Sequence, residues 1–211
     1  MQSILYISCS PRGSASQSLT FAEEVLTRLR QHHPAATIRR RDLAADPPGF
    51  VDATFSNAVL DPASPPQAFA QSETLIQELE HADAVVIATP MHNFTVPAVL
   101  KAWIDQVVRI HRTFTSTPAG KVGALTDRLV FIVIASGGWF SGPSPNGAPA
   151  QPDFLTPYLR VVLNTIGLRD IHILTWKESP EAPPCWNGQS PLRGKHSTVS
   201  FPRVDPLMPQ G

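Results

Sequence analysis

The sequence predicts an α/β fold organised on a parallel β-sheet, and two apolar runs are the main evidence. Residues 84–88 read AVVIA and residues 129–135 read LVFIVIA, and neither run alternates with polar side chains. Runs without alternation are typical of strands in the middle of a parallel sheet, where helices cover both faces. Segments with helical spacing lie between these runs and three weaker strand-like segments, so strands and helices alternate along the chain.

The first half of the chain is expected to hold two strands and two helices. Residues 3–8 (SILYIS) form a strand, and residues 37–43 form a weaker one at a solvated edge, which includes the run Arg39-Arg40-Arg41. The helix between them has four apolar residues on one face: Phe21, Val25, Leu26 and Leu29. Residues 44–67 show little periodicity and predict a long loop. A helix over about residues 67–82 places Phe69, Leu75, Ile76 and Leu79 inward and Glu73, Glu78 and Glu80 outward.

The second half repeats the alternation. After the strand at 84–88, a helix over residues 96–110 is expected to be capped by Thr95, with Pro97 in its first turn. Residues 109–126 form a polar connection to the strand at 129–135. A last helix is expected to begin with Thr156-Pro157 and to end at Gly167, and residues 170–176 form the fifth strand.

Five strands joined by right-handed crossovers predict a flavodoxin-like three-layer sandwich with strand order 2-1-3-4-5. We expect residues 1–177 to form this single domain. Residues 178–211 contain seven prolines and no apolar period. We expect this tail to be irregular or disordered.

Composition narrows the function classes. Lysine plus arginine and aspartate plus glutamate both number 17, so no nucleic-acid or membrane surface is expected. The two cysteines have no metal or disulfide spacing, and no apolar run reaches 18 residues. These features favour a cytoplasmic protein without a metal site. The loop after the first strand also lacks the P-loop and dinucleotide-binding fingerprints.

Three unusual turns follow strands one, three and four, which are neighbours in the predicted order. Their carboxyl ends therefore meet at one edge of the sheet, where open α/β sheets bind ligands. The first turn is rich in serine and opens a helix, so its residues either bind a phosphate or merely cap that helix. The candidate residues are Ser10, Ser16, Gln17 and Ser18 in the first turn, Met91, His92, Asn93 and Phe94 in the second, and Ser136, Gly137, Gly138 and Trp139 in the third.

Taken together, these motifs resemble the FMN-dependent NADH azoreductases, also described as FMN-dependent NADH:quinone oxidoreductases. The resemblance covers roughly residues 1–177, and further matches are Asp42-Leu43-Ala44, Lys101 with Asp105, Thr113-Phe114 and Thr156-Pro157-Tyr158-Leu159. Three features depart from the family pattern. His92 replaces a tyrosine, the arginine often found before the glycine pair is absent, and the tail lacks the pattern of the family's final helix.

The resemblance implies FMN, with the serine turn at its phosphate, Met91, Phe94 and Trp139 as walls for the ring, and Asn93 and the glycine pair at the ring's polar edge. It implies hydride transfer from NADH or NADPH to quinones or azo compounds in a ping-pong sequence, with no obligatory protein acid or base. It also implies a homodimer in which Phe114 lines the substrate pocket near the partner's flavin. The apolar Trp103 and Val108 on the helix over residues 96–110 favour the same assembly.

Two other interpretations remain open at the sequence level. The chain is alternatively an FMN electron carrier that acts through partner proteins, although such carriers usually have an acidic face and this chain is neutral. It is alternatively a truncated relative with poor activity. Single residues also have simpler roles: Met91 and Phe94 as core caps, His92 as a hydrogen-bonded loop residue, and Phe114 as packing.

Overall fold

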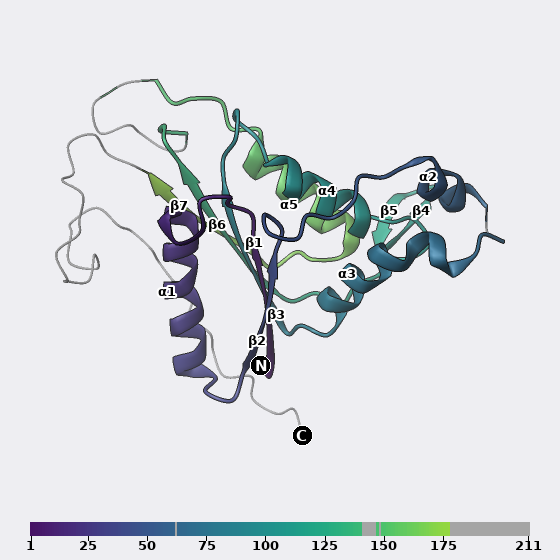
Figure 1. The fold of residues 1–211 in the computed structure, drawn as a ribbon, viewed down its shortest axis with the longest axis horizontal. Helices are drawn as coiled ribbons and strands as arrows, with labels where there is room; N and C mark the ends of the chain where they lie inside the picture. Colours follow the sequence, from purple (N-terminus) through teal and green to yellow (C-terminus); the bar gives the residue numbers. More distant parts are fainter. Residues whose placement is uncertain (62, 141–146, 148, 178–211) are drawn as a thin grey trace. The chain divides into compact units, whose positions relative to one another are not determined.

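A parallel five-stranded sheet forms the centre of the computed structural model, which describes residues 1–61, 63–140, 147 and 149–177 (Figure 1). The strand order is β2-β1-β3-β6-β7, and every neighbouring pair is parallel. This is the predicted 2-1-3-4-5 order when the separate β4-β5 hairpin is set aside. The strands are β1 (Ser3–Ser8), β2 (Thr37–Asp42), β3 (Ala84–Pro90), β6 (Leu129–Ser136) and β7 (Ile171–Lys177).

Helices lie on both faces of the sheet. In Figure 1, α1 stands on one side of the strands, and α3, α4 and α5 stand on the other. Two separate apolar cores match this division, one between the sheet and α1 and a larger one beneath α3, α4 and α5. The helices are α1 (Gln17–His32), α2 (Ala53–Leu60), α3 (Ala70–Glu80), α4 (Ala98–Val107) and α5 (Leu155–Ile166).

Both segments expected to be irregular contain short regular elements. The segment over residues 44–67 includes α2, whose N-cap Asp52 accepts a hydrogen bond from Phe55 N at 2.8 Å, and the start of a 3₁₀ turn, Pro66–Phe69. The connection over residues 109–126 includes an antiparallel hairpin of β4 (Phe114–Thr117) and β5 (Gly120–Gly123). The eight-residue α2 and the two four-residue hairpin strands lack the continuous apolar runs that indicated the central strands.

Two predicted helix caps are wrong, because the chain caps these helices differently. Pro97 is the N-cap residue of α4, and Thr95 pairs with His92 in the preceding turn. At α5 the N-cap residue is Phe154, and the side chain of the preceding Asp153 caps the helix, because its Oδ1 accepts hydrogen bonds from Leu155 N at 3.0 Å and Thr156 N at 2.9 Å. The predicted end is confirmed, since Gly167 has φ 110° in the left-handed region.

The predicted outward position of Glu78 is also wrong. Its side chain is only 2% exposed, and it accepts hydrogen bonds from the Nε and Nη2 atoms of Arg41. Arg39 Nη2 lies 3.1 Å from the same carboxylate. A helical period separates polar from apolar faces, but it cannot show that a carboxylate is buried against cations on a distant strand. Burial of this charge depends on the guanidinium partners of β2.

Two glycines allow close backbone packing between β5 and the end of α5. A Cβ atom on Gly123 would lie 2.2 Å from Gly167 N, and one on Gly167 would lie 2.4 Å from Leu125 O. Leu125 N also donates a hydrogen bond to Ile166 O at 3.0 Å. This contact anchors the hairpin segment to α5.

Residues 178–211 lie outside the described part of the chain. The prediction that they are irregular therefore concerns residues that the structure does not describe. Within the described ranges, none of the helices combines the length and apolar character needed to cross a membrane.

A charged cluster joins α3 to the segment that follows α4. Arg112 binds Glu73 and Glu80, each with a 2.7 Å contact. Arg109 lies 2.8 Å from Glu73 and 2.9 Å from Ser72 Oγ, and its guanidinium lies over the Phe69 ring. Hydrogen bonds from Arg112, followed by those from Arg109, lower the pKa of Glu73 to about 2 from an ordinary value of 4.5.

This cluster predicts a loss of stability in acid. A carboxylate with a lowered pKa contributes stability above its unfolded-state pKa, and the contribution is lost as the pH falls towards the folded-state value. The free energy of unfolding, measured by urea denaturation, should therefore fall between pH 4.5 and 2. Glu73→Gln should flatten that pH dependence, whereas the control Glu24→Gln, at a half-buried position on α1, should not. Parallel pH profiles for the wild type and Glu73→Gln would contradict this assignment.

Candidate functional site

The sheet brings the three predicted turns to one edge. Ser8 of β1 is in register with Ala88 of β3, and Pro90 of β3 is in register with Ala135 of β6. The hydrogen bonds continue one residue past the strands, from Cys9 N to Ala88 O at 3.0 Å and from Met91 N to Ala135 O at 2.8 Å. The segments over residues 10–18, 91–94 and 136–139 therefore begin side by side at the carboxyl end of the sheet.

In the first turn, two buried hydroxyl groups meet at the start of α1. Ser16 Oγ and Ser18 Oγ lie 3.0 Å apart, and the two residues are 4% and 0% exposed. Ser16 is the N-cap residue, yet its hydroxyl makes no capping hydrogen bond to the helix backbone. The interpretation of the serines as simple caps therefore does not fit Ser16. Gln17 follows it as the first helical residue and is exposed.

The backbone N–H groups of this turn differ in whether they already have a partner. The N–H of Ser16 donates to Gly13 O at 3.0 Å, so it already has a partner. The N–H groups of Gln17 and Ser18 lie in the first turn of α1, where a helix offers no carbonyl partner. Ser10 is buried, and its Oγ accepts a hydrogen bond from Arg12 N at 3.3 Å. Hydroxyl and N–H donors thus surround the positive end of the helix dipole.

The second turn is tight and strained. His92 N donates to Thr95 O at 2.9 Å, and Thr95 N donates to His92 O at 3.0 Å. The two central residues, Asn93 and Phe94, have φ angles of 48° and 71°. Asparagine tolerates this region, but it is unusual for a bulky aromatic residue, and such strain gathers at functional sites. Phe94 remains 43% exposed, so it does not cap the core as the simpler interpretation requires.

The third turn is held by a residue that the sequence analysis missed. Ser136 Oγ accepts hydrogen bonds from Gly138 N at 3.2 Å and from Gln151 Nε2 at 2.7 Å. Gln151 N also donates to Trp139 O at 2.7 Å. A Cβ atom on Gly137 would meet nothing within 4 Å, so open space lies beside the turn there. No motif in the sequence marks Gln151, because its role depends on contacts across loops.

Phe114 is not brought to these turns within its own chain. It is 8% exposed at the base of the β4-β5 hairpin, and Lys121 Nζ lies 5.2 Å from the centre of its ring. In Figure 1 the hairpin lies near α2 and α3, away from the carboxyl ends of β1, β3 and β6. A role for Phe114 at a flavin therefore requires the flavin of another subunit.

Other groups with reactive potential have structural roles. Cys9 is fully buried, and this burial raises the pKa of its thiol, so it behaves as a small apolar residue. His172 Nε2 lies 2.8 Å from Asp170 Oδ1, and its ring packs near Phe131. In the part of the chain that the structure describes, no group of three or more His, Cys, Asp or Glu side chains could hold a metal.

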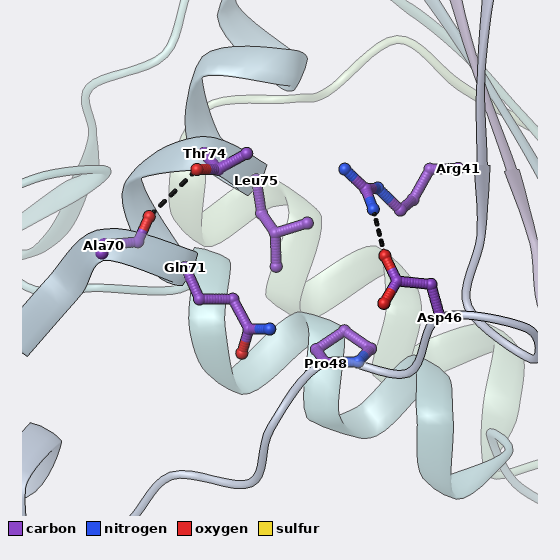
Figure 2. Close-up of a pocket in the computed structure, with 7 residues that line it drawn as sticks. All are labelled: Arg41, Asp46, Pro48, Ala70, Gln71, Thr74 and Leu75. Carbon is purple, nitrogen blue, oxygen red and sulfur yellow. Dashed lines mark hydrogen bonds and ion pairs between the residues drawn. The ribbon is translucent and has the colours of Figure 1, made fainter.

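A cavity of about 400 Å³ lies between the end of β2 and α3, apart from the three turns (Figure 2). Its polar groups already have partners. Arg41 binds Asp46 at 2.8 Å, Thr74 Oγ1 donates to Ala70 O at 3.0 Å, and Gln71 Oε1 accepts from Gly49 N at 2.8 Å. Because these polar atoms already have protein partners, they offer little for recognition of a ligand.

Comparisons with known proteins agree with this geometry. The model of a family described as having the flavodoxin-like fold matches residues 2–184. The "FMN-dependent NADH:quinone oxidoreductase 4" of Pseudomonas fluorescens is 50% identical over 173 residues, which cover 81% of this chain and 82% of that protein. The "FMN-dependent NADH:quinone oxidoreductase 2" of Cupriavidus pinatubonensis is 48% identical over 179 residues, which cover 82% and 85%.

Solved structures support the fold. An azoreductase from Bacillus anthracis superposes with a TM-score of 0.71 at 24% identity, over 84% of this chain and 87% of that one. An FMN-dependent NADH-azoreductase from the same species, solved in complex with FMN, gives a TM-score of 0.69 at 23% identity, over 84% and 87%. The sheet order, the three adjoining turns and these sequence matches together show that the chain belongs to the flavodoxin-like family, among the FMN-dependent NADH:quinone oxidoreductases.

Proposed function

We propose that this protein is an FMN-dependent oxidoreductase that takes a hydride from NADH, or from NADPH, and passes it to quinones or azo compounds. The observation that carries the proposal is the buried pair of hydroxyls of Ser16 and Ser18 at the start of α1, beside the strained turn over residues 91–94. The names of relatives up to 50% identical point to the same activity.

The residues present fit FMN. A phosphate dianion is stabilised by N–H and O–H donors at a helix N-terminus and needs no lysine there. Ser10, Ser16 and Ser18 would supply the hydroxyls, and Gln17 and Ser18 the backbone N–H groups. The Ser16 hydroxyl supports this assignment most directly, because it is buried at the N-cap position without capping the helix.

Apolar and polar groups of the other two turns match the ring of FMN. Met91, Phe94 and Trp139 would line its flat faces. The hydrogen bonds of the 91–94 turn use the N–H groups of His92 and Thr95 and not those of Asn93 and Phe94, which would serve as donors to the polar edge of the ring. Bound FMN supplies the hydride chemistry, and the chain positions it, excludes water and places donors where negative charge gathers. No side chain need act as an obligatory acid or base.

Replacing Ser16 and Ser18 together by Ala should weaken FMN binding. Each hydrogen bond to a charged group is worth roughly 1.5–3 kcal/mol, so the dissociation constant should rise at least about tenfold. The double change removes both partners of the 3.0 Å contact, so neither hydroxyl is left buried alone. Fluorescence titration with FMN measures the effect, and Thr27→Ala, farther along α1, is the matched control. Unchanged affinity in the double variant would place the phosphate elsewhere.

The proposed activity predicts ping-pong kinetics. In the absence of oxygen, added NADH should bleach the visible absorbance of the bound flavin, and a quinone added afterwards should restore it. Steady-state rates with NADH and a quinone varied together should give parallel lines in double-reciprocal plots, because the two substrates use one site in turn. A protein that binds FMN but is not reduced by NADH or NADPH would instead be an electron carrier serving a partner protein.

We further propose a two-fold homodimer, although one sequence argument for it is wrong. Trp103 is 1% exposed and lies in the core of its own chain. Support comes instead from exposed apolar residues at the site and along α5, namely Phe94, Phe154 and Val161, which are 43%, 62% and 64% exposed. A second subunit would also explain how Phe114, remote from the turns of its own chain, could reach a flavin and line the substrate pocket.

Light scattering should therefore give about twice the chain mass of 22.9 kDa. Val161→Glu should shift the protein towards the monomer if α5 lies in the interface, because a carboxylate would be buried without a partner. The control Glu24→Gln, on α1, should leave the mass unchanged. A monomer with full flavin content and activity would contradict the proposal.

We also propose that residues 1–177 act as one cytoplasmic domain. The free, buried Cys9 and the absence of cysteine spacing for a disulfide framework are compatible with a reducing compartment. Neither the balanced charge nor the candidate site calls for nucleic acid or a membrane as a partner.

A further inference from the structure

Gln151 connects two of the three turns through its side-chain amide. Its Nε2 atom donates to Ser136 Oγ at 2.7 Å and approaches Met91 Sδ at 3.4 Å. Its backbone N–H donates to Trp139 O at 2.7 Å. One residue from the segment before α5 therefore contacts the ends of both β3 and β6.

The Gln151 amide also determines which hydrogen bonds the Ser136 hydroxyl can make. A hydroxyl oxygen has two acceptor lone pairs, and here one receives Gln151 Nε2–H while the other receives Gly138 N–H at 3.2 Å. The Ser136 proton is then the part of the group that remains for donation. The hydroxyl lies 3.9 Å from Met91 Sδ, which is a weak acceptor. Gln151 thus makes Ser136 a donor towards any stronger acceptor that enters the site.

The backbone at Gly138 packs closely against the side-chain amide of Gln151. A Cβ atom at position 138 would lie 2.6 Å from Gln151 Oε1 and 2.9 Å from its Cδ. The neighbouring Gly137 has no such constraint, since a Cβ atom there would meet nothing within 4 Å. The missing side chain at position 138 therefore makes room for the Gln151 amide.

We propose that Gln151 is a positioning residue of the flavin site. By holding the Ser136 hydroxyl and the Met91 thioether in one arrangement, it sets the affinity and the reduction potential of FMN bound between the two turns. This inference rests on the proposed function, because it assumes that FMN binds at these turns.

Three variants test the role. Gln151→Ala removes both amide contacts and should raise the FMN dissociation constant roughly tenfold, the effect of about one net hydrogen bond. Gly138→Ala should have a similar effect by displacing the amide. Gln151→Glu keeps the shape but replaces the N–H donors by a carboxylate, and it should shift the midpoint potential of bound flavin to more negative values, because added negative charge disfavours reduction. The two Gln151 variants keep the backbone bond to Trp139 and should melt without FMN near the wild-type temperature.

The matched control is Gln71→Ala, which removes another glutamine side chain that contacts a loop, at the distant cavity of Figure 2. It should leave the affinity and the potential unchanged.

If the wild type binds no FMN, the proposed function fails before Gln151 is tested. If the wild type binds FMN and the Gln151 variants match its affinity and potential, the inference on Gln151 is overturned. It is also overturned if Gln151→Glu restores wild-type affinity and potential while Gln151→Ala merely lowers the melting temperature, since shape alone would then suffice.

Discussion

The register of three parallel strands is the constraint on which the rest of the structure depends. Strands β1, β3 and β6 are the interior strands, and their central residues are almost completely excluded from water. A slip of one residue would exchange the side chains that face α1 with those that face α3, α4 and α5. Because both faces are packed, the register is strongly specified. Its consequence is that the strands end at one level, and the segments over residues 10–18, 91–94 and 136–139 begin as neighbours.

The segment before α5 supports the turns that the strands deliver. Phe154 N donates to Phe94 O at 3.0 Å and thereby holds the strained central residue of the second turn. Gln151 holds the third turn through Ser136 and Trp139, and Asp153 caps the helix that follows. Two nearby residues of one connection, Gln151 and Phe154, therefore hold two different turns of the candidate site. Such support keeps a site in one arrangement before a ligand binds, which reduces the cost of ordering it.

Charged side chains are concentrated away from the candidate site. The Arg41–Glu78 pair ties β2 to α3, and Arg112 with Glu73 ties α3 to the segment after α4. None of the candidate residues of the three turns is an aspartate, glutamate, lysine or arginine. A site of this kind binds an anionic cofactor through oriented N–H and O–H groups, so its interaction with the phosphate does not depend on a lysine or arginine.

Local patterns in the sequence were sufficient for the elements with strong signals. The continuous apolar runs predicted the central strands, and the alternation of strands and helices predicted their order, because a buried parallel sheet tolerates few other arrangements. Gly167 was predicted as a helix end for an equally local reason, because glycine readily adopts the left-handed backbone that the structure shows there. The three turns stood out because serine, glycine and apolar loop residues are unusual directly after buried strands.

Contacts between residues distant in sequence were decided only by the tertiary structure. Glu78 appeared solvent-facing on a helical wheel and proved to be buried against Arg41, 37 residues away. Gln151 carries no local signal, since its role depends on Ser136 and Met91 being adjacent across two strands. Trp103 has the same apolar character whether it faces a partner or its own core, and only packing places it in the core. The sequence by itself determined which segments form the sheet and where its turns lie, because those preferences are local. The tertiary structure decided which polar groups meet, because hydrogen bonds and ion pairs depend on positions in space that sequence spacing does not encode.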